Sequence, residues 1–379
     1  MYAVTMSRRR FVGQGFCGLA SLASLVARPG KARAQAEPGA AIGPMIDRAV
    51  KFLRPRQDAK GGWSTQREPG ITALVVTAIL RSGQVPPGDS MVTKALRYLE
   101  GFIGPKGGLS EAPHANYSTS IALVAFQQAN MNGRYDRVIK AGQDFLTSMQ
   151  WDEGEGKSRS DAFYGGAGYG GKNSRPDLSN TAFFMEALRD TGLPADDPHL
   201  QKALVFVSRC QNLKSEFNDQ PWAGKINDGG FIYTAAQGGS SMAGKDAGGG
   251  LRSYASMTYA GLKSMIYAGL MREDPRVKAA FDYITHHYSL DENPGLGQQG
   301  LYYYYHTFAK TMSVLETPTI TDTAGSAHDW RSELIAALAK RQQADGSWVN
   351  SADRFMEGDP NLVTAYALLA LAYTRPKVR

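Results

Sequence analysis

Residues 342–348 read Gln-Gln-Ala-Asp-Gly-Ser-Trp, a glycine-centred turn that ends in a large aromatic side chain. Related turns recur along the chain, each between two apolar segments. The other five are residues 61–64, 107–110, 168–171, 228–231 and 300–302. Each turn needs glycine for backbone angles that other residues resist, and a bulky side chain to fill the space between neighbouring helices. The sequence therefore predicts a sixfold helical repeat.

The segments on the two sides of each turn differ in their apolar pattern. Before the turns, apolar residues recur at helical spacing with charges between them, as in Ile46, Val50 and Leu53. After the turns, the segments are nearly free of charge: 71–80, 119–126, 181–188, 257–270, 307–315 and 363–372. One helix of each pair is therefore expected on the outside and the other buried on the inside. Six such pairs predict an all-α fold, an (α/α)6 toroid.

This toroid is predicted to be one domain over residues 45–375. The middle repeats are longer than the others because they carry insertions at 152–167 and 212–249, which are rich in glycine and serine. We expect both insertions to be surface loops or lids.

Residues 342–348 match the Q-x-x-D-G-S-W motif of squalene–hopene cyclases and their relatives. Over residues 45–375 the chain thus resembles the prenyltransferase/squalene oxidase repeat family. The resemblance implies the toroid that these cyclases share with the β subunits of protein prenyltransferases. A shared fold does not decide function, so each chemistry of the family is tested on the residues.

The cyclase chemistry of the family depends on an Asp-x-Asp-Asp-Thr-Ala run, whose middle Asp protonates the polyene. The matching residues 177–182 read Asp-Leu-Ser-Asn-Thr-Ala, so that Ser179 and Asn180 replace the acids that matter. A serine hydroxyl cannot protonate an alkene, whereas an activated carboxylic acid can. We therefore expect no acid-initiated cyclisation. Asp177 remains either a catalytic acid or the N-cap of the helix beside it.

The prenyltransferase chemistry of the family depends on zinc held by Asp, Cys and His. His306 follows four tyrosines and precedes Thr307, and it stands where the family's Phe-Tyr-His-Thr run places its zinc-binding histidine. The other ligands should open the preceding inner helix, yet residues 247–272 contain no Cys, Asp or Glu. We predict no bound metal, because one histidine does not hold a catalytic zinc ion. His306 then either lines a cavity or belongs to the core, and no cofactor motif is present.

Six threonines mark the beginnings of the inner helices, which point toward one end of the ring: Thr72, Thr119, Thr181, Thr258, Thr307 and Thr364. We predict that Asp177, Asn180, Tyr254, Tyr303 and His306 meet at this mouth of a central cavity and form the site, with Asp177 and His306 as catalytic candidates.

Basic residues on the loops that lead to this mouth would accommodate an anionic head group, or are ordinary solvated loop charges. They are Lys172, Arg175, Lys245 and Arg252. Of these, Arg175 and Arg252 are the candidate ligand-binding residues.

Three functions are compatible with these residues. The first is a binding protein whose apolar, aromatic-lined cavity holds an isoprenoid, another hydrophobic small molecule or a lipid, or which binds a protein partner. The second is a terpenoid cyclase- or transferase-like enzyme that uses Asp177 and His306. The third is a polysaccharide-acting enzyme, since (α/α)6 barrels also carry such activities. The missing acids favour the binding protein.

The N-terminus predicts export. Residues 1–34 combine the twin arginine Arg8–Arg9, a short apolar run and the Ala32-Arg33-Ala34 cleavage site of a twin-arginine signal peptide, followed by a linker at 35–44. Without residues 1–34 the chain has 36 basic and 35 acidic residues, so the net charge falls from +7 to +1 and gives no reason to expect nucleic acid binding. No other segment has the length of a membrane span. The mature protein is expected in the periplasm or outside the cell.

Overall fold

The computed structural model describes residues 38–64, 68–170 and 174–375. The predicted signal peptide, the first three residues of the predicted linker and Lys172 lie outside this part. The described helices are α1 (Pro38–Leu53), α2 (Pro69–Arg81), α3 (Ser90–Glu100), α4 (Ala115–Gln128), α5 (Asp136–Thr147), α6 (Leu178–Asp190), α7 (Pro198–Arg209), α8 (Ala255–Tyr267), α9 (Pro275–His286), α10 (Leu301–Leu315), α11 (Trp330–Arg341) and α12 (Pro360–Thr374). Strands β1 (Ile320–Thr321) and β2 (Ala327–His328) form one short antiparallel hairpin between α10 and α11.

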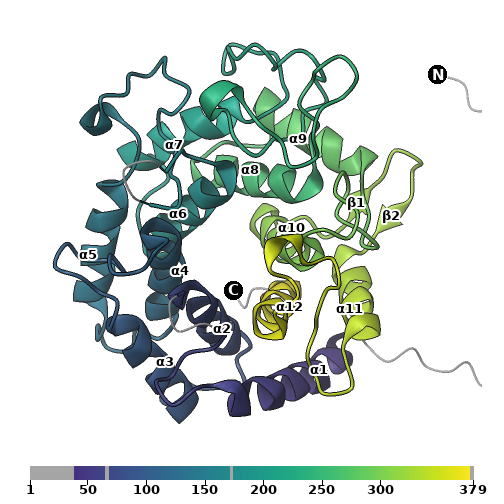
Figure 1. Cartoon of the computed structure of the whole chain (residues 1–379). Helices are drawn as coiled ribbons and strands as arrows, with labels where there is room; N and C mark the ends of the chain where they lie inside the picture. The colour runs from purple at the N-terminus through teal and green to yellow at the C-terminus, as the bar shows by residue number, and fades with distance from the viewer. Residues whose placement is uncertain (1–37, 65–67, 171–173, 376–379) are drawn as a thin grey trace, which may run out of the picture. The chain divides into compact units, whose positions relative to one another are not determined.

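The even-numbered helices form an inner ring. Each packs against the even-numbered helices on its two sides, and α12 packs against α2, which closes the ring (Figure 1). The odd-numbered helices lie around the outside, each against one or two inner helices. The predicted all-α (α/α)6 toroid is thereby confirmed. The first helix begins at Pro38, so α1 includes part of the predicted linker and contributes Ile42 and Met45 to the core.

Burial separates the two layers as the apolar patterns predict. Residues 362–371 of α12 are all buried, whereas α3 buries one face and leaves the other in solvent. Four outer helices begin after an aspartate whose side chain accepts a hydrogen bond from a backbone N–H of the first turn. These N-caps are Asp89, Asp197, Asp274 and Asp329.

The threonines at the beginnings of the inner helices hold the glycine-rich turns. In five repeats the threonine hydroxyl oxygen accepts a hydrogen bond of 2.8–3.1 Å from the backbone N–H of a turn residue. The pairs are Trp63 with Thr72, Leu109 with Thr119, Ala167 with Thr181, Phe231 with Thr258 and Trp348 with Thr364. Because both groups are buried, each bond ties the end of the turn to the inner helix that follows it.

A glutamine links each of four turns to the outer helix of the next repeat. The Gln342 side-chain amide donates to the Gly346 carbonyl at 2.9 Å and to the Met45 carbonyl at 2.9 Å, which joins the last repeat to α1. Gln57, Gln150 and Gln211 make the same pair of bonds in their own repeats. These bonds explain why the Q-x-x-D-G-S-W motif closes the ring.

Glycine is required where a turn touches the next outer helix. Gly346 has φ +93°, and a Cβ added there would lie 2.4 Å from the Arg48 carbonyl oxygen of α1. Gly165 occupies the equivalent place in the third repeat, against the Lys202 carbonyl of α7. The predicted third turn, 168–171, is therefore three residues too late, because this stretch of sequence contains two glycine-rich runs and only contact with α7 distinguishes them.

The fifth repeat departs from the pattern. Gly300 is the left-handed residue before α10 and does not contact an outer helix. Thr307 donates to the Tyr303 and Tyr304 carbonyls of its own helix instead of holding a turn. The predicted turn at 300–302 is thus the beginning of an inner helix.

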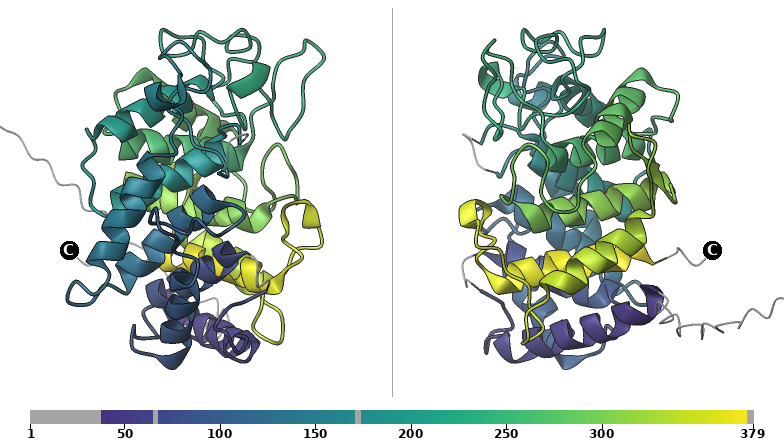
Figure 2. Two further views of the ribbon diagram at one scale, coloured as in Figure 1. Left: turned by 60° about the vertical axis from the view of Figure 1, so that its left-hand side comes forward. Right: turned by 90° about the vertical axis from the view of Figure 1, so that its right-hand side faces the viewer.

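All inner helices run in the same direction, so the ring has an N-terminal mouth, where they begin, and a C-terminal mouth, where they end. The long connections, including 148–170 and 210–254, gather at the N-terminal mouth, opposite the end of α12 (Figure 2). The predicted insertions lie within these two connections and contain no α-helix. None of the described helices is long and apolar enough to cross a bilayer.

Candidate functional site

One face of α6 follows the bore of the ring from mouth to mouth. At helical spacing it presents Ser179, Phe183, Glu186 and Asp190, which change from hydroxyl to aromatic to charged side chains. Each of these groups meets side chains from other inner helices.

Asp177 caps α6 at the N-terminal mouth. Its Oδ1 accepts from the Asn180 backbone N–H at 2.9 Å, and its Oδ2 accepts from the Asn180 side-chain amide at 2.8 Å. The side chain is buried, and burial raises the pKa of this carboxyl to about 6 despite those hydrogen bonds. The charge of Arg175 acts in the opposite direction and helps to keep the carboxylate ionised. Asp177 is thus the N-cap of α6, one of its two predicted roles. Its carboxyl titrates in the weakly acidic range.

Ser179 stands where the cyclases have their proton donor. Its hydroxyl lies 3.0 Å from the hydroxyl of Tyr303, on α10. Burial also raises the pKa of the Tyr303 phenol. The contact is neutral, and neither group supplies a strong acid.

Aromatic side chains meet across the bore below Ser179. We call this group the aromatic band; it consists of Tyr117, Phe183, Tyr303, His306, Tyr366 and Tyr373. Ring centroids lie 5.3 Å apart for Tyr117 and Phe183, and 6.3 Å apart for Phe183 and Tyr303. Four different inner helices contribute, so the band spans the ring.

His306 lies at the lower side of the aromatic band. Its ring stacks between Phe183 at 6.4 Å, Tyr366 at 5.7 Å and Tyr373 at 6.0 Å. Burial lowers the pKa of this imidazole to about 3, even though the Glu186 carboxylate favours the protonated form. The Nδ1 atom is buried and has no hydrogen-bond partner. No hydrogen bond joins His306 to Asp177 in the described part of the chain, so the catalytic pairing of these two residues stays a prediction.

The other predicted site residues lie around the N-terminal mouth. Tyr254 is buried and precedes α8. Arg175 reaches the Ser240 hydroxyl at 3.4 Å, whereas Arg252 and Lys245 are exposed on the loop before α8. Of the predicted residues, the structure joins Asp177 directly to Asn180, and Tyr303 to His306 through their shared neighbours Phe183 and Tyr366.

A second polar group at this mouth was not found from the sequence. Glu68, just before α2, forms an ion pair with His114 at 2.5 Å and accepts from the Ser118 hydroxyl at 3.3 Å. The His114 ring lies 4.9 Å from that of Tyr169, whose side chain is 41% exposed and is in turn 5.9 Å from Tyr117. Exposed aromatic surface thus continues into the aromatic band. Glu68 and His114 lie in short connections without a motif, so their pairing depends on the ring.

Charged side chains occupy the lower half of the bore. We call them the charged cluster: Arg81, Glu186, Asp190, Lys263 and Lys310. Glu186 pairs with Lys263, with Lys310 at 3.2 Å and with Arg81 at 3.9 Å. Burial would raise the pKa of Glu186, but the lysine charges outweigh it and hold the pKa well below its usual range. The carboxylate is therefore ionised and bound by three cations.

The sequence contains an indication of the charged cluster, namely isolated charged residues in apolar segments. Glu186 and Lys263 are the single charges of the apolar segments 181–188 and 257–270, at the same register after Thr181 and Thr258. A lone charge on a helix that is buried all round must find a partner. The equal register would have placed both side chains at the same depth in the ring.

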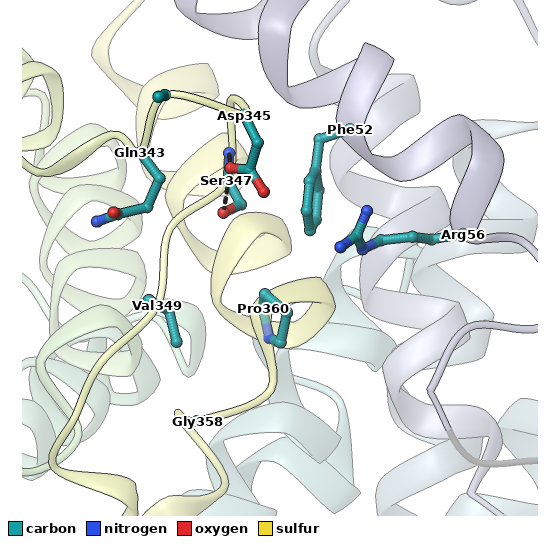
Figure 3. A pocket seen from close by; sticks show the side chains of 9 residues that line it. Phe52, Arg56, Gln343, Asp345, Ser347, Val349, Gly358 and Pro360 are labelled. Carbon is teal, nitrogen blue, oxygen red and sulfur yellow. Dashed lines mark hydrogen bonds between the residues drawn. The ribbon is translucent and has the colours of Figure 1, made fainter.

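Two hollows lie outside the aromatic band, although Tyr373 of the band lines one of them. One is an open hollow of about 480 Å³ on the outer surface, where Phe52 and Arg56 face the 343–347 turn (Figure 3). There the Asp345 carboxylate accepts from the Ser347 hydroxyl at 2.7 Å, so its polar groups serve the turn. The other, of about 570 Å³, lies below the charged cluster at the C-terminal mouth. We call it the basal cavity.

Among the described residues, no group of three or more His, Cys, Asp or Glu side chains is arranged to hold a metal ion. Cys210 is buried at the end of α7, as a small apolar residue would be.

Comparison with solved structures identifies the architecture. A variant of the type II terpene cyclase MstE from Scytonema, in complex with geranylgeranyl dihydroxybenzoate, superimposes with a TM-score of 0.54 at 12% identity, over 89% of this chain and 98% of that one. A protein from Actinoplanes gives 0.52 at 15% identity, over 88% and 99%. A family 76 glycoside hydrolase from a bovine Bacteroides thetaiotaomicron strain gives 0.52 at 12% identity, over 86% and 77%.

The chain has the terpene cyclase-type toroid fold. The predicted resemblance to the squalene cyclase toroids is confirmed at the level of the fold. No family model and no curated protein matches the sequence. At these identities the likeness describes the toroid alone, and a glycoside hydrolase shares it, so function has to be argued from the residues in the bore.

Proposed function

We propose that the mature protein is an exported toroid that binds an isoprenoid or similar apolar ligand at its N-terminal mouth without acid-initiated cyclisation. The aromatic band carries this proposal. Its rings extend from the exposed Tyr169 surface to the interior of the bore, and ring faces attract apolar chains. Hydroxyl groups such as those of Ser179 and Tyr303 supply the few polar contacts that orient a ligand.

The residues argue against proton-initiated chemistry. Ser179 replaces the donor acid, and the Asp177 carboxyl is occupied by the backbone and side chain of Asn180. His306 is neutral over the physiological pH range because its pKa is lowered to about 3. A neutral imidazole surrounded by rings provides contact surface, and it cannot donate a proton as an imidazolium.

An enzymatic function is the second candidate, and two observations favour it. The Asp177 carboxyl has a pKa of about 6, in the range of a general acid or base at near-neutral pH. The buried Nδ1 atom of His306 has no partner and is available to a substrate. The structural likeness to a glycoside hydrolase keeps a polysaccharide substrate within this alternative.

Ligand binding is tested first on the native material. Organic extracts of the mature protein, purified from its own host, should contain a co-purifying apolar compound by mass spectrometry. Geranylgeraniol serves as the defined probe in a binding titration. Tyr169→Ala, at the exposed edge of the site, should weaken its binding about five- to tenfold, whereas the control Met271→Ala, also an exposed apolar residue, should not. Absence of both a co-purifying compound and measurable geranylgeraniol binding would overturn the proposal.

Turnover is tested with the same probe. Incubation with geranylgeraniol should return it unchanged by gas chromatography and mass spectrometry. A cyclised product that disappears in Asp177→Asn and in His306→Ala would instead establish the enzymatic alternative.

Export is part of the proposal and rests on residues 1–34. Replacement of Arg8 and Arg9 by lysine should leave the precursor inside the cell, and cleavage should follow Ala34. Normal export of the Lys-Lys variant would contradict the twin-arginine route.

A further inference from the structure

The basal cavity lies at the opposite end of the ring from the proposed ligand mouth. It is lined by the last turns of inner helices, and its volume of about 570 Å³ lies in the range of small-molecule sites. Cationic side chains surround it: Arg81, Arg189, Lys310 and Arg375. Asp190 is the one acidic residue of its lining.

The charged cluster uses some of these cations. Arg81 pairs with Asp190 at 2.6 Å, and Lys310 pairs with Asp190 at 3.0 Å and with Glu186 at 3.2 Å. These bonds hold the upper wall of the cavity in place. They also occupy the single acidic residue of its lining, so that residue is not available to the remaining cations.

Two guanidinium groups remain without a carboxylate. Within the described residues, neither Arg189 nor Arg375 belongs to an ion pair. Arg189 donates to the Leu193 carbonyl and Arg375 to the Ser82 carbonyl. The Nε atom of Arg189 is buried and has no hydrogen-bond partner. A buried donor without a partner is costly, and a ligand oxygen would satisfy it.

The remaining wall is apolar. Ile266, Val314 and Ala372 line it together with the rings of Tyr267 and Tyr373. The cavity thus places guanidinium donors next to a hydrocarbon surface. This combination fits a molecule with an anionic group and an apolar body.

We propose that the basal cavity binds a small organic anion, a carboxylate or phosphate monoester with an apolar part, through Arg189 and Arg375. The planar guanidinium forks match the oxygens of either group. The apolar part contacts Ile266, Val314 and Ala372. The charged cluster lies between this site and most of the aromatic band, and Tyr373 is the one residue of the band that also lines the cavity.

The cations also lie where the inner helices end, and helix C-termini attract positive charge. A purely structural role for Arg189 and Arg375 predicts that their loss changes stability without any anion being bound. The ligand proposal predicts anion binding that depends on both side chains. The experiment separates these two outcomes.

The test is isothermal titration calorimetry of the mature protein with octyl phosphate below its critical micelle concentration, with inorganic phosphate and with octanol. Octyl phosphate should bind and octanol should not. Tighter binding of octyl phosphate than of inorganic phosphate supports an amphiphile with an anionic head, and equal binding supports a free anion in the same site.

Arg189→Gln and Arg375→Gln should each weaken octyl phosphate binding by about tenfold or more. Arg137→Gln, a matched change on the exposed face of α5, should not. Ala372→Trp keeps every charge and fills the cavity, so it should also abolish binding while the circular dichroism spectrum stays native. Binding of octanol as tight as that of octyl phosphate, no anion binding at all, or unchanged binding in both folded arginine variants would overturn the proposal.

Discussion

The wall of the ring, which consists of the turns and the helices that they contact, is built from repeated contacts, whereas the bore is built from contacts that occur once. In the wall, the same contacts recur: Thr364 holds the turn residue Trp348, and Gln342 bridges its turn to the next outer helix, as equivalent residues do in other repeats. In the bore no contact recurs. One helix contributes Glu186, the next Lys263 and the next Lys310, and they meet in one cluster.

This difference separates architecture from specificity. A contact that recurs in repeat after repeat can only build the ring, since it treats all repeats alike. A contact made once, from side chains of several helices, is where one toroid differs from another. Substitutions in each region should therefore differ in their effect on stability.

The largest effect is expected in the bore, from Glu186→Ala. The change leaves Lys263, Lys310 and Arg81 without their shared carboxylate in a buried site. Removal of one partner from a buried ion pair costs about 3–5 kcal/mol. Denaturant unfolding should show this loss, and Asp144→Asn, which breaks an exposed pair with Lys140, should cost less than about 1 kcal/mol. Equal costs for the two variants would refute a distinct role for the charged cluster.

A pH-dependent effect is expected at the N-terminal mouth. The folded-state pKa of Asp177, about 6, lies above its ordinary value of 3.8, so its protonated form favours the folded state. The stabilisation of the folded state by Asp177 protonation is complete below about pH 4 and is lost as the pH rises through about 6. By linkage it amounts to at most about 3 kcal/mol.

The free energy of unfolding, measured from pH 4 to 6.5, should therefore fall for the wild type relative to Asp177→Asn. Comparison with the variant removes the contributions of other titrating groups such as His306, because both proteins contain them. A difference that is flat, or that grows in favour of the wild type with rising pH, would show that Asp177 is not held in this buried state.

In the wall, Gly346→Ala is expected to cost about 1–3 kcal/mol. The residue has a left-handed backbone, and the added Cβ would meet the Arg48 carbonyl at the closure of the ring. Thermal unfolding is the measurement. Gly88→Ala is the control, because a Cβ there meets nothing within 4 Å; a similar loss in the control would remove the argument for the close contact.

The smallest effect is expected from Tyr303→Phe, which removes the hydroxyl bonded to Ser179 and keeps the ring in the aromatic band. The cost in stability should be about 1 kcal/mol. A double-mutant cycle with Ser179→Ala measures the coupling between the two hydroxyls. A coupling energy of zero would mean that the hydrogen bond between the two hydroxyls does not contribute to stability.

Parts of the wall that repeat locally could be predicted from the sequence. The turn at 342–348 and the threonines at the beginnings of the inner helices identify six helix pairs. Each turn needs its glycine and its bulky side chain within a few residues of each other. The third turn could not be placed in this way. Gly165 and Gly168 are equally good turn residues locally, and only the backbone of α7, adjacent in space, distinguishes them.

The candidate site was predictable only in part. Asp177, Asn180, Tyr303 and His306 could be named because a family motif or a helix beginning marks them. Glu68 and Glu186 carry no such mark. Their partners come from other helices, and a partner across the ring has no fixed spacing in the chain.

The sequence by itself therefore determined the number of helix pairs, the inner and outer layers, and the presence of Ser179 where the cyclase motif that it resembles has an acid. These follow from residue types at short, regular spacing, which local chemistry constrains. The tertiary structure alone decided which side chains share the bore. Closure of the ring brings α2, α6, α8 and α10 together, so that Arg81, Glu186, Lys263 and Lys310 become neighbours. No short-range pattern encodes that meeting, because it depends on the sum of all six repeats.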